Sequence, residues 1–118
     1  MKIGIVGSRS FPRLDQVEAA IVELPSGCTV ISGGAKGVDS IAASTARSRG
    51  IHVIEHLPNL EGCSRRHDFT KRFYERNQKI VDDCDSLIAF TEKESGGTWD
   101  SIKRAKKAGK PVRVVRPN

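Results

Sequence analysis

The sequence lacks the features of several large classes of protein. Its 118 residues include no apolar run of the length that a membrane-spanning helix requires, and the N-terminus carries no signal peptide. The three cysteines Cys28, Cys63 and Cys84 are an odd number without metal-ligand spacing, which indicates reduced thiols rather than a disulfide framework. We therefore expect a cytoplasmic protein that does not contact a membrane.

Motifs of common catalytic and metal sites are also missing. Neither a Gly-x-Ser-x-Gly segment nor a catalytic Cys–His arrangement occurs in the sequence. The histidines His52, His56 and His67 lack the neighbouring cysteine or carboxylate pattern typical of zinc ligands. Repeats, linkers and low-complexity tracts are absent as well. The sequence thus predicts a single domain over residues 1–118, without a metal site and without a required cofactor.

Acidic residues are fewer than basic ones. The chain has 20 Lys and Arg against 14 Asp and Glu, which gives a net charge of +6. Such an excess favours an anionic partner: a nucleotide, a nucleic acid or another phosphate. Five basic residues fall within one predicted helix, where they form either a solvated face or a track for a nucleic-acid backbone: Lys103, Arg104, Lys106, Lys107 and Lys110.

Apolar strand patterns alternate with helical patterns along the chain. The strands are predicted at residues 2–6, 29–32, 51–57, 86–90 and 111–115. The helices are predicted over residues 12–23, 38–49 and 68–83, and from a cap at Thr98 to Gly109, with Ala108 among the inward residues. This alternation predicts an α/β, Rossmann-like three-layer sandwich whose helices cover both faces of a mostly parallel five-stranded sheet.

Glycine-containing turns follow the first, second and fourth predicted strands. Because the carboxyl ends of parallel strands meet at one edge of a sheet, these turns should converge there. A helix that starts after such a turn directs free N–H groups and the positive end of its dipole at a ligand, which favours phosphate. The expected ligand-binding residues are Gly7, Ser8, Arg9, Ser32, Gly33, Gly34, Ala35, Lys36, Gly37, Asp39, Arg76, Asn77, Gly96, Gly97 and Thr98.

Roles within this set follow from residue type. Arg9, Lys36 and Arg76 would neutralise phosphate charge, and Asp39 and Asn77 would select a sugar or a base. The phosphate itself is expected against the N–H groups of residues 34–37. The alternative for Asp39 is that it only complements the dipole of its helix. Trp99, the single tryptophan, is either a base-stacking residue or part of the core or a dimer interface.

The order and spacing of these motifs resemble the SLOG superfamily. This Rossmann-like group includes the DprA/Smf DNA-processing proteins, the LOG phosphoribohydrolases and small YspA-like nucleotide-sensing domains. The segment Ser32-Gly33-Gly34-Ala35-Lys36-Gly37-Val38-Asp39 is similar to the glycine motif of the DprA and YspA branches. Arg76-Asn77, Ser95-Gly96-Gly97-Thr98 and Gly109-Lys110-Pro111-Val112 match in order, and Gly7-Ser8-Arg9 resembles the YspA-like members most. The resemblance implies a small phosphorylated ligand and a homodimer formed through helices that flank the site.

One departure from this family bears on catalysis. The LOG enzymes carry Pro-Gly-Gly-x-Gly-Thr followed three residues later by a catalytic Glu, whereas this chain has Ser101 at that position. We therefore expect a binding module, a sensor or carrier of a nucleotide or nucleotide-derived ligand. The first alternative is a nucleoside-monophosphate N-glycoside hydrolase that uses Asp39 or Asp100 as its carboxylate. The second is DprA-like single-stranded DNA binding, and weak nucleic-acid binding is expected in either case.

Overall fold

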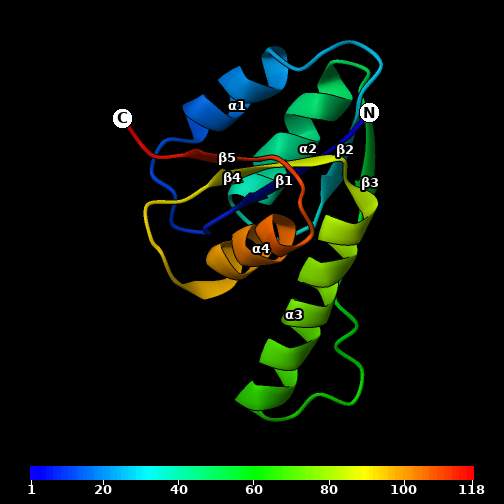
Figure 1. Ribbon diagram of the computed structural model, residues 1–118, viewed down its shortest axis with the longest axis vertical. Coiled ribbons are helices and arrows are strands. Elements are labelled where there is room, and N and C mark those ends of the chain that lie inside the picture. Colours follow the sequence, from blue (N-terminus) through cyan, green and yellow to red (C-terminus); the bar gives the residue numbers. More distant parts are fainter.

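Five short apolar runs form one parallel sheet in the computed structural model, which describes residues 1–118 (Figure 1). The spatial order of the strands is β3-β2-β1-β4-β5, and all four neighbouring pairs are parallel. The strands are β1 (Lys2–Gly7), β2 (Thr29–Ser32), β3 (His52–Glu55), β4 (Ser86–Phe90) and β5 (Val112–Val115). The predicted α/β sandwich is thereby confirmed, and its sheet is entirely parallel.

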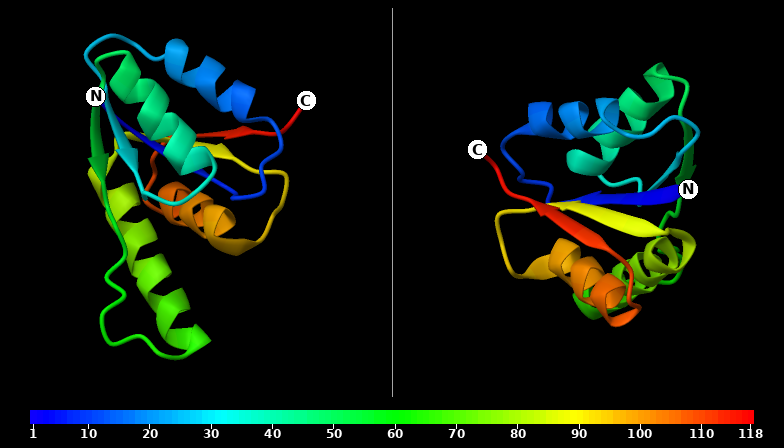
Figure 2. Two further views of the ribbon diagram at one scale, coloured as in Figure 1. Left: turned by 180° about the vertical axis from the view of Figure 1, so that it is seen from behind. Right: turned by 45° about the horizontal axis from the view of Figure 1, so that its top comes forward.

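Two pairs of helices cover the two faces of the sheet (Figure 2). One face carries α1 (Leu14–Val22) and α2 (Val38–Ser48), and the other carries α3 (Arg66–Asp83) and α4 (Gly96–Lys107). Each face has its own apolar core, as is usual for a parallel sheet that is buried on both sides. Ala42 and Ala46 of α2 are fully buried, because small residues let this helix approach the sheet closely. None of the four helices has the length and apolar character needed to cross a membrane.

Several elements differ from the sequence prediction at their ends. Helix α3 starts at Arg66 rather than at residue 68, because the Asp68 carboxylate accepts hydrogen bonds from the N–H groups of Ser64 and Arg65 and so caps the helix earlier. Helix α4 starts at Gly96, so Thr98 lies in its first turn and is not its cap. Ala108 follows the last residue of α4 and is exposed, although its spacing indicated an inward position.

The strand order reverses its direction of progression between β1 and β4. In open parallel sheets, a crevice forms beyond the carboxyl ends of the strands at such a switch point, because the crossover connections leave in opposite directions. The turns after β1, β2 and β4 all lie at this edge of the sheet, as the alternating pattern predicted.

Candidate functional site

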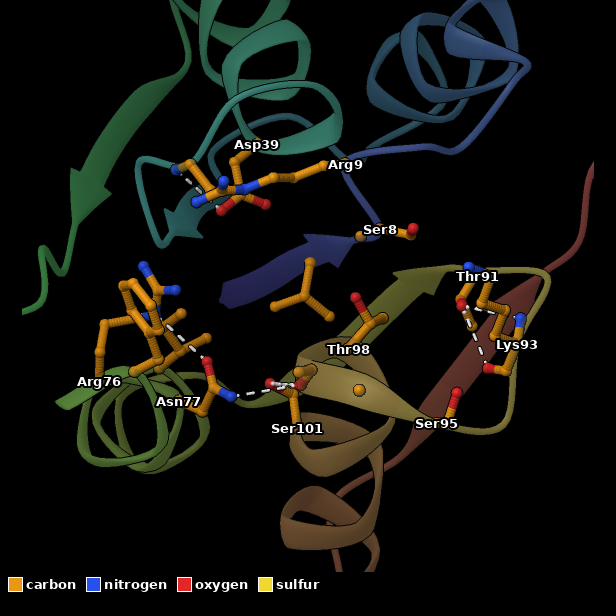
Figure 3. Close-up of a pocket in the computed structure, with 17 residues that line it drawn as sticks. Ser8, Arg9, Asp39, Arg76, Asn77, Thr91, Lys93, Ser95, Thr98 and Ser101 are labelled. Carbon is orange, nitrogen blue, oxygen red and sulfur yellow. Dashed lines mark hydrogen bonds between the residues drawn. The ribbon is translucent and has the colours of Figure 1, made fainter. Parts of the chain in front are cut away.

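A cavity of about 460 Å³ lies at the switch point of the sheet (Figure 3). Asp39 and Arg9 approach it from the side of α2, and Asn77, Thr98 and Ser101 approach it from the side of α3 and α4. Ten of the residues expected from the sequence line it: Gly7, Ser8, Arg9, Ala35, Asp39, Arg76, Asn77, Gly96, Gly97 and Thr98. The parallel sheet therefore brings together residues as far apart in the chain as Gly7 and Thr98.

The first turn of α4 supplies free hydrogen-bond donors to this cavity. No side chain caps the helix, and the N–H groups of Gly96, Gly97 and Thr98 have no acceptor in the protein. The Gly97 carbonyl accepts hydrogen bonds from Asn77 Nδ2 at 3.2 Å and from Ser101 Oγ at 3.3 Å. Because the C=O and N–H of a trans peptide point in opposite directions, these bonds fix the Thr98 N–H toward the open end of the helix. This turn has the properties of an anion site.

Two cationic side chains line the cavity from different sides: Lys93 from the loop before α4, and Arg9 from the α2 side, beside Asp39 (Figure 3). Arg9 and Lys93 line it, and neither forms a side-chain hydrogen bond or an ion pair within the protein. The Lys93 backbone is held by Thr91, whose Oγ1 accepts from the Lys93 N–H at 3.1 Å and donates to the Lys93 carbonyl at 3.2 Å. Both cations are therefore available to an anionic ligand.

Arg76 connects two of the turns. Its guanidinium donates to the Gly33 carbonyl and to Asn77 Oδ1, the latter at 3.2 Å. Burial lowers the pKa of Arg76 from its usual range; the Asp39 carboxylate opposes this shift and Arg9 adds to it. Asn77 in turn donates to Gly97 and to Asp100 Oδ2, so α3 joins the turn after β2 to the first turn of α4.

Asp39 is the only carboxylate that lines the cavity. Its side chain is buried, with 5% of the residue exposed. The Oδ2 atom accepts a hydrogen bond from the Ala35 N–H at 3.2 Å, whereas Oδ1 is buried without any partner. Burial raises the pKa of Asp39 to about 6, against the lowering effect of the Ala35 hydrogen bond and of the Arg76 charge.

The turn between β2 and α2 uses its N–H groups within the protein. The Gly34 N–H donates to Ser32 Oγ at 3.3 Å, and the Ala35 N–H donates to Asp39. The sequence placed phosphate against the N–H groups of residues 34–37, but at the first two of these positions a hydroxyl and a carboxylate already accept the hydrogen bonds, so phosphate is not favoured there. The structure does not bring the other members of this motif to the cavity: Ser32, Gly33, Gly34, Lys36 and Gly37.

Two glycines of this turn serve packing instead. A Cβ at Gly33 would lie 2.7 Å from Arg76 Nη1 and 3.0 Å from Asp39 Oδ2, so a side chain there would separate the arginine from the turn. Gly34 has a φ of +70°, and a Cβ there would collide with Leu57 on the side of β3. The glycine motif thus has a structural explanation at these two positions.

Other residues that line the cavity were not selected from the sequence: Val6, Phe73, Ile80, Thr91, Lys93, Ser95 and Ser101. Phe73 is the single aromatic residue among them. Lys93 lies in a loop that has no motif of its own. Only its position after β4 could have indicated that it lies at the ligand-binding edge of the sheet. Asp100 and Trp99 do not line the cavity: Asp100 pairs with Arg104 at 2.7 Å, and Trp99 packs against the core beneath α4.

Comparison with known proteins identifies one family. Residues 8–62, which include the turns after β1 and β2, match the model of the YspA, cpYpsA-related SLOG family. No curated protein matches the sequence.

Solved structures share the fold over nearly the whole chain. The DNA processing protein A (DprA) of Streptococcus pneumoniae aligns with a TM-score of 0.84 and 23% identity over 99% of this chain and 50% of that protein. The Helicobacter pylori DprA, whose structure concerns single-stranded DNA binding, gives 0.78 and 23% over 100% of this chain and 66% of that protein. The molybdenum cofactor binding protein of Rippkaea orientalis gives 0.70 and 21%, over 99% and 77%. This chain thus spans half of the first DprA and about two thirds of the second.

Proposed function

Because this chain belongs to the SLOG superfamily, we propose that it binds a nucleotide or a nucleotide-derived phosphate ligand in the cavity at the switch point. The observation that carries the proposal is the first turn of α4, whose unpaired N–H groups face a cavity that is also lined by two unpaired cations, Arg9 and Lys93. Backbone donors at a helix start, reinforced by free positive charge, form a favourable environment for a phosphate group.

The remainder of the cavity suits the rest of such a ligand. A volume of about 460 Å³ lies within the range of small-molecule sites, roughly 300–1,000 Å³. Phe73 offers an aromatic ring on the wall formed by α3, where a base could stack. One exposed lysine, Lys93, lines this cavity and another, Lys36, does not, so the two can be compared in a test of ligand binding.

Lys93 lines the cavity and Lys36 does not, although both are exposed lysines in turns at the same edge of the sheet. We expect Lys93→Ala to weaken binding of the tightest of the four ribonucleoside 5′-monophosphates by about three- to tenfold, because one charge-assisted contact with phosphate is lost. Lys36→Ala should leave the affinity within about twofold of the native protein. Isothermal titration calorimetry at fixed salt measures both values.

A stronger variant supports the same test. A Cβ at Gly97 would have only Asn77 Nδ2 within reach, at 4.0 Å, so Gly97→Asp is compatible with the fold and its charge complements the helix dipole. The added carboxylate would compete with phosphate for the N–H groups, and binding should fall by at least about tenfold. Equal affinities of the Lys93→Ala, Lys36→Ala and Gly97→Asp variants would rule out this cavity as the phosphate site.

A second candidate is hydrolysis of the N-glycosidic bond of a nucleoside monophosphate. One observation favours it: Asp39 lines the cavity with its pKa raised to about 6, which suits a general acid or base near neutral pH. Asp100 is less suited, because it is paired with Arg104 outside the cavity. Chromatography for free base, with native protein and with Asp39→Asn, separates this candidate from binding alone.

A third candidate is binding of single-stranded DNA. The support is the basic outer face of α4, where Lys103, Lys106 and Lys107 are exposed, together with the fold shared with DprA. If long oligonucleotides bind with an affinity that falls steeply with salt, and mononucleotides do not bind, this candidate is preferred.

A further inference from the structure

The unpartnered oxygen of Asp39 has no structural explanation. Only 5% of the residue is exposed, and Oδ1 has no hydrogen-bond partner in the protein. Buried polar atoms are normally hydrogen-bonded, since leaving one unpaired is destabilising. Oδ1 also has no role in the turn that precedes helix α2, because the hydrogen bond from the Ala35 N–H is accepted by Oδ2. The orphan atom belongs to a side chain that lines the ligand cavity.

The two sides of the cavity offer different groups to a ligand. The α4 turn and Lys93 present hydrogen-bond donors and a positive charge with no carboxylate among them, whereas on the α2 side the cations Arg9 and Arg76 lie close to the Asp39 carboxylate (Figure 3). The α4 side is therefore the better place for a phosphate, and the unpaired Oδ1 atom of Asp39 is left for a hydrogen-bonding group without negative charge. A hydroxyl fits this position in either protonation state, because it can donate to a carboxylate and accept from a carboxylic acid.

Building on the proposed function, we propose that Asp39 binds a sugar hydroxyl of the ligand through Oδ1, so that the site selects ribonucleotides over nucleotides whose sugar lacks hydroxyls. Asp39 is in this sense a specificity residue. The hydroxyl supplies the hydrogen bond that Oδ1 lacks in the free protein.

The test compares the tightest-binding ribonucleoside 5′-monophosphate with its 2′,3′-dideoxy counterpart, which has the same base and the same phosphate. Calorimetry gives the ratio of the two dissociation constants for the native protein and for three variants: Asp39→Asn, Asp39→Ala and Glu55→Gln. Glu55 is the matched control, since its carboxylate pairs with Arg47 near Asp39 but does not line the cavity. Asp39→Asn keeps the shape of the side chain, so it should fold even if Asp39→Ala does not.

For the native protein and for Glu55→Gln we expect the dideoxy compound to bind at least about tenfold more weakly, since a hydrogen bond to a charged group is lost. For Asp39→Ala, which has no hydrogen-bonding group, the ratio should fall below about threefold, while binding of the dideoxy compound persists. For Asp39→Asn the ratio should lie between that of Asp39→Ala and the native value, because a neutral amide can still bond a hydroxyl but without the charge. If the native protein binds both compounds equally, or if a folded Asp39→Ala protein keeps the native ratio, the hydroxyl contact is refuted and phosphate binding stands. If no ribonucleotide binds, the proposed function fails together with this inference.

Discussion

At the scale of single residues, Asp39 should make stability depend on pH in an unusual direction. Its pKa is raised to about 6 by burial, so at intermediate pH the folded protein keeps a proton that the unfolded chain releases. The contribution of Asp39 to the free energy of unfolding should therefore fall as pH rises from about 4 to about 6, by up to about 3 kcal/mol, and then stay level. Asp39→Asn removes this titration, so the variant should be more stable than the native protein at about pH 7 and not at about pH 4.

Urea denaturation of both proteins at the two pH values measures this difference. The other carboxylates, including Asp68 and Asp83 with their lowered pKa values, titrate in both proteins and cancel in the comparison. If the free energies of unfolding of the native protein and of Asp39→Asn differ by the same amount at both pH values, the raised pKa of Asp39 is wrong. The stability cost of this buried carboxylate is consistent with a residue kept for ligand contact.

At the scale of elements, α3 should control the phosphate-binding turn of α4. Asn77 Nδ2 donates both of its hydrogens within the protein, to the Gly97 carbonyl and to Asp100, and Asn77 Oδ1 accepts from Arg76. We therefore expect Asn77 to position the α4 turn rather than to select a sugar or base, the role that its residue type indicated. Asn77→Ala should lower nucleotide affinity by about three- to tenfold, because the Gly97–Thr98 peptide loses one of its two side-chain restraints. Gln78→Ala is the matched control on the next residue, since Gln78 bonds Asp82 and Arg104 but not Gly97.

A readout at the backbone separates positioning from general destabilisation. In nuclear magnetic resonance spectra, inorganic phosphate should shift the Thr98 amide proton strongly in the native protein and in Gln78→Ala, and weakly in Asn77→Ala. An unchanged Thr98 response in a folded Asn77→Ala protein would show that α3 does not orient this turn.

At the scale of the whole molecule, the first half of α3 projects beyond the sheet (Figure 1). Three of the five exposed large apolar side chains lie on it or on the preceding loop: Leu57, Leu60 and Tyr74. We expect a homodimer at micromolar concentration, because the family resemblance places the contact on helices beside the site and these side chains are apolar. Light scattering should give twice the chain mass for the native protein and one chain mass for Leu60→Asp/Tyr74→Asp.

Val22→Asp is the control for this experiment, since Val22 is at least as exposed as Leu60 and Tyr74 but lies on α1, on the opposite face of the sheet. It should remain dimeric. A native protein that scatters as a monomer throughout the micromolar range would exclude the dimer, and dissociation by Val22→Asp would place the contact on another face.

The sequence by itself determined the layers, the parallel sheet and the edge at which the turns meet. Those properties depend on local periodicity: short apolar runs such as residues 86–90 must be buried strands, and the spacing of Val17, Ala20 and Ile21 must be a helix face. It also selected Asp39, Arg9 and Gly97, because residue type and a place after a strand suffice to bring them to the carboxyl edge.

Only the tertiary structure decided which glycine turn is open to a ligand. The two turns look alike in sequence, but Ser32 and Asp39 occupy the N–H groups of the first, while Asn77 and Ser101 hold the carbonyl of the second and leave its N–H groups free. Those partners come from other segments or from side-chain directions that periodicity does not encode. Lys93 and Phe73 line the cavity for the same reason. Their position there depends on which segments lie next to them in space, and the sequence around them does not indicate this.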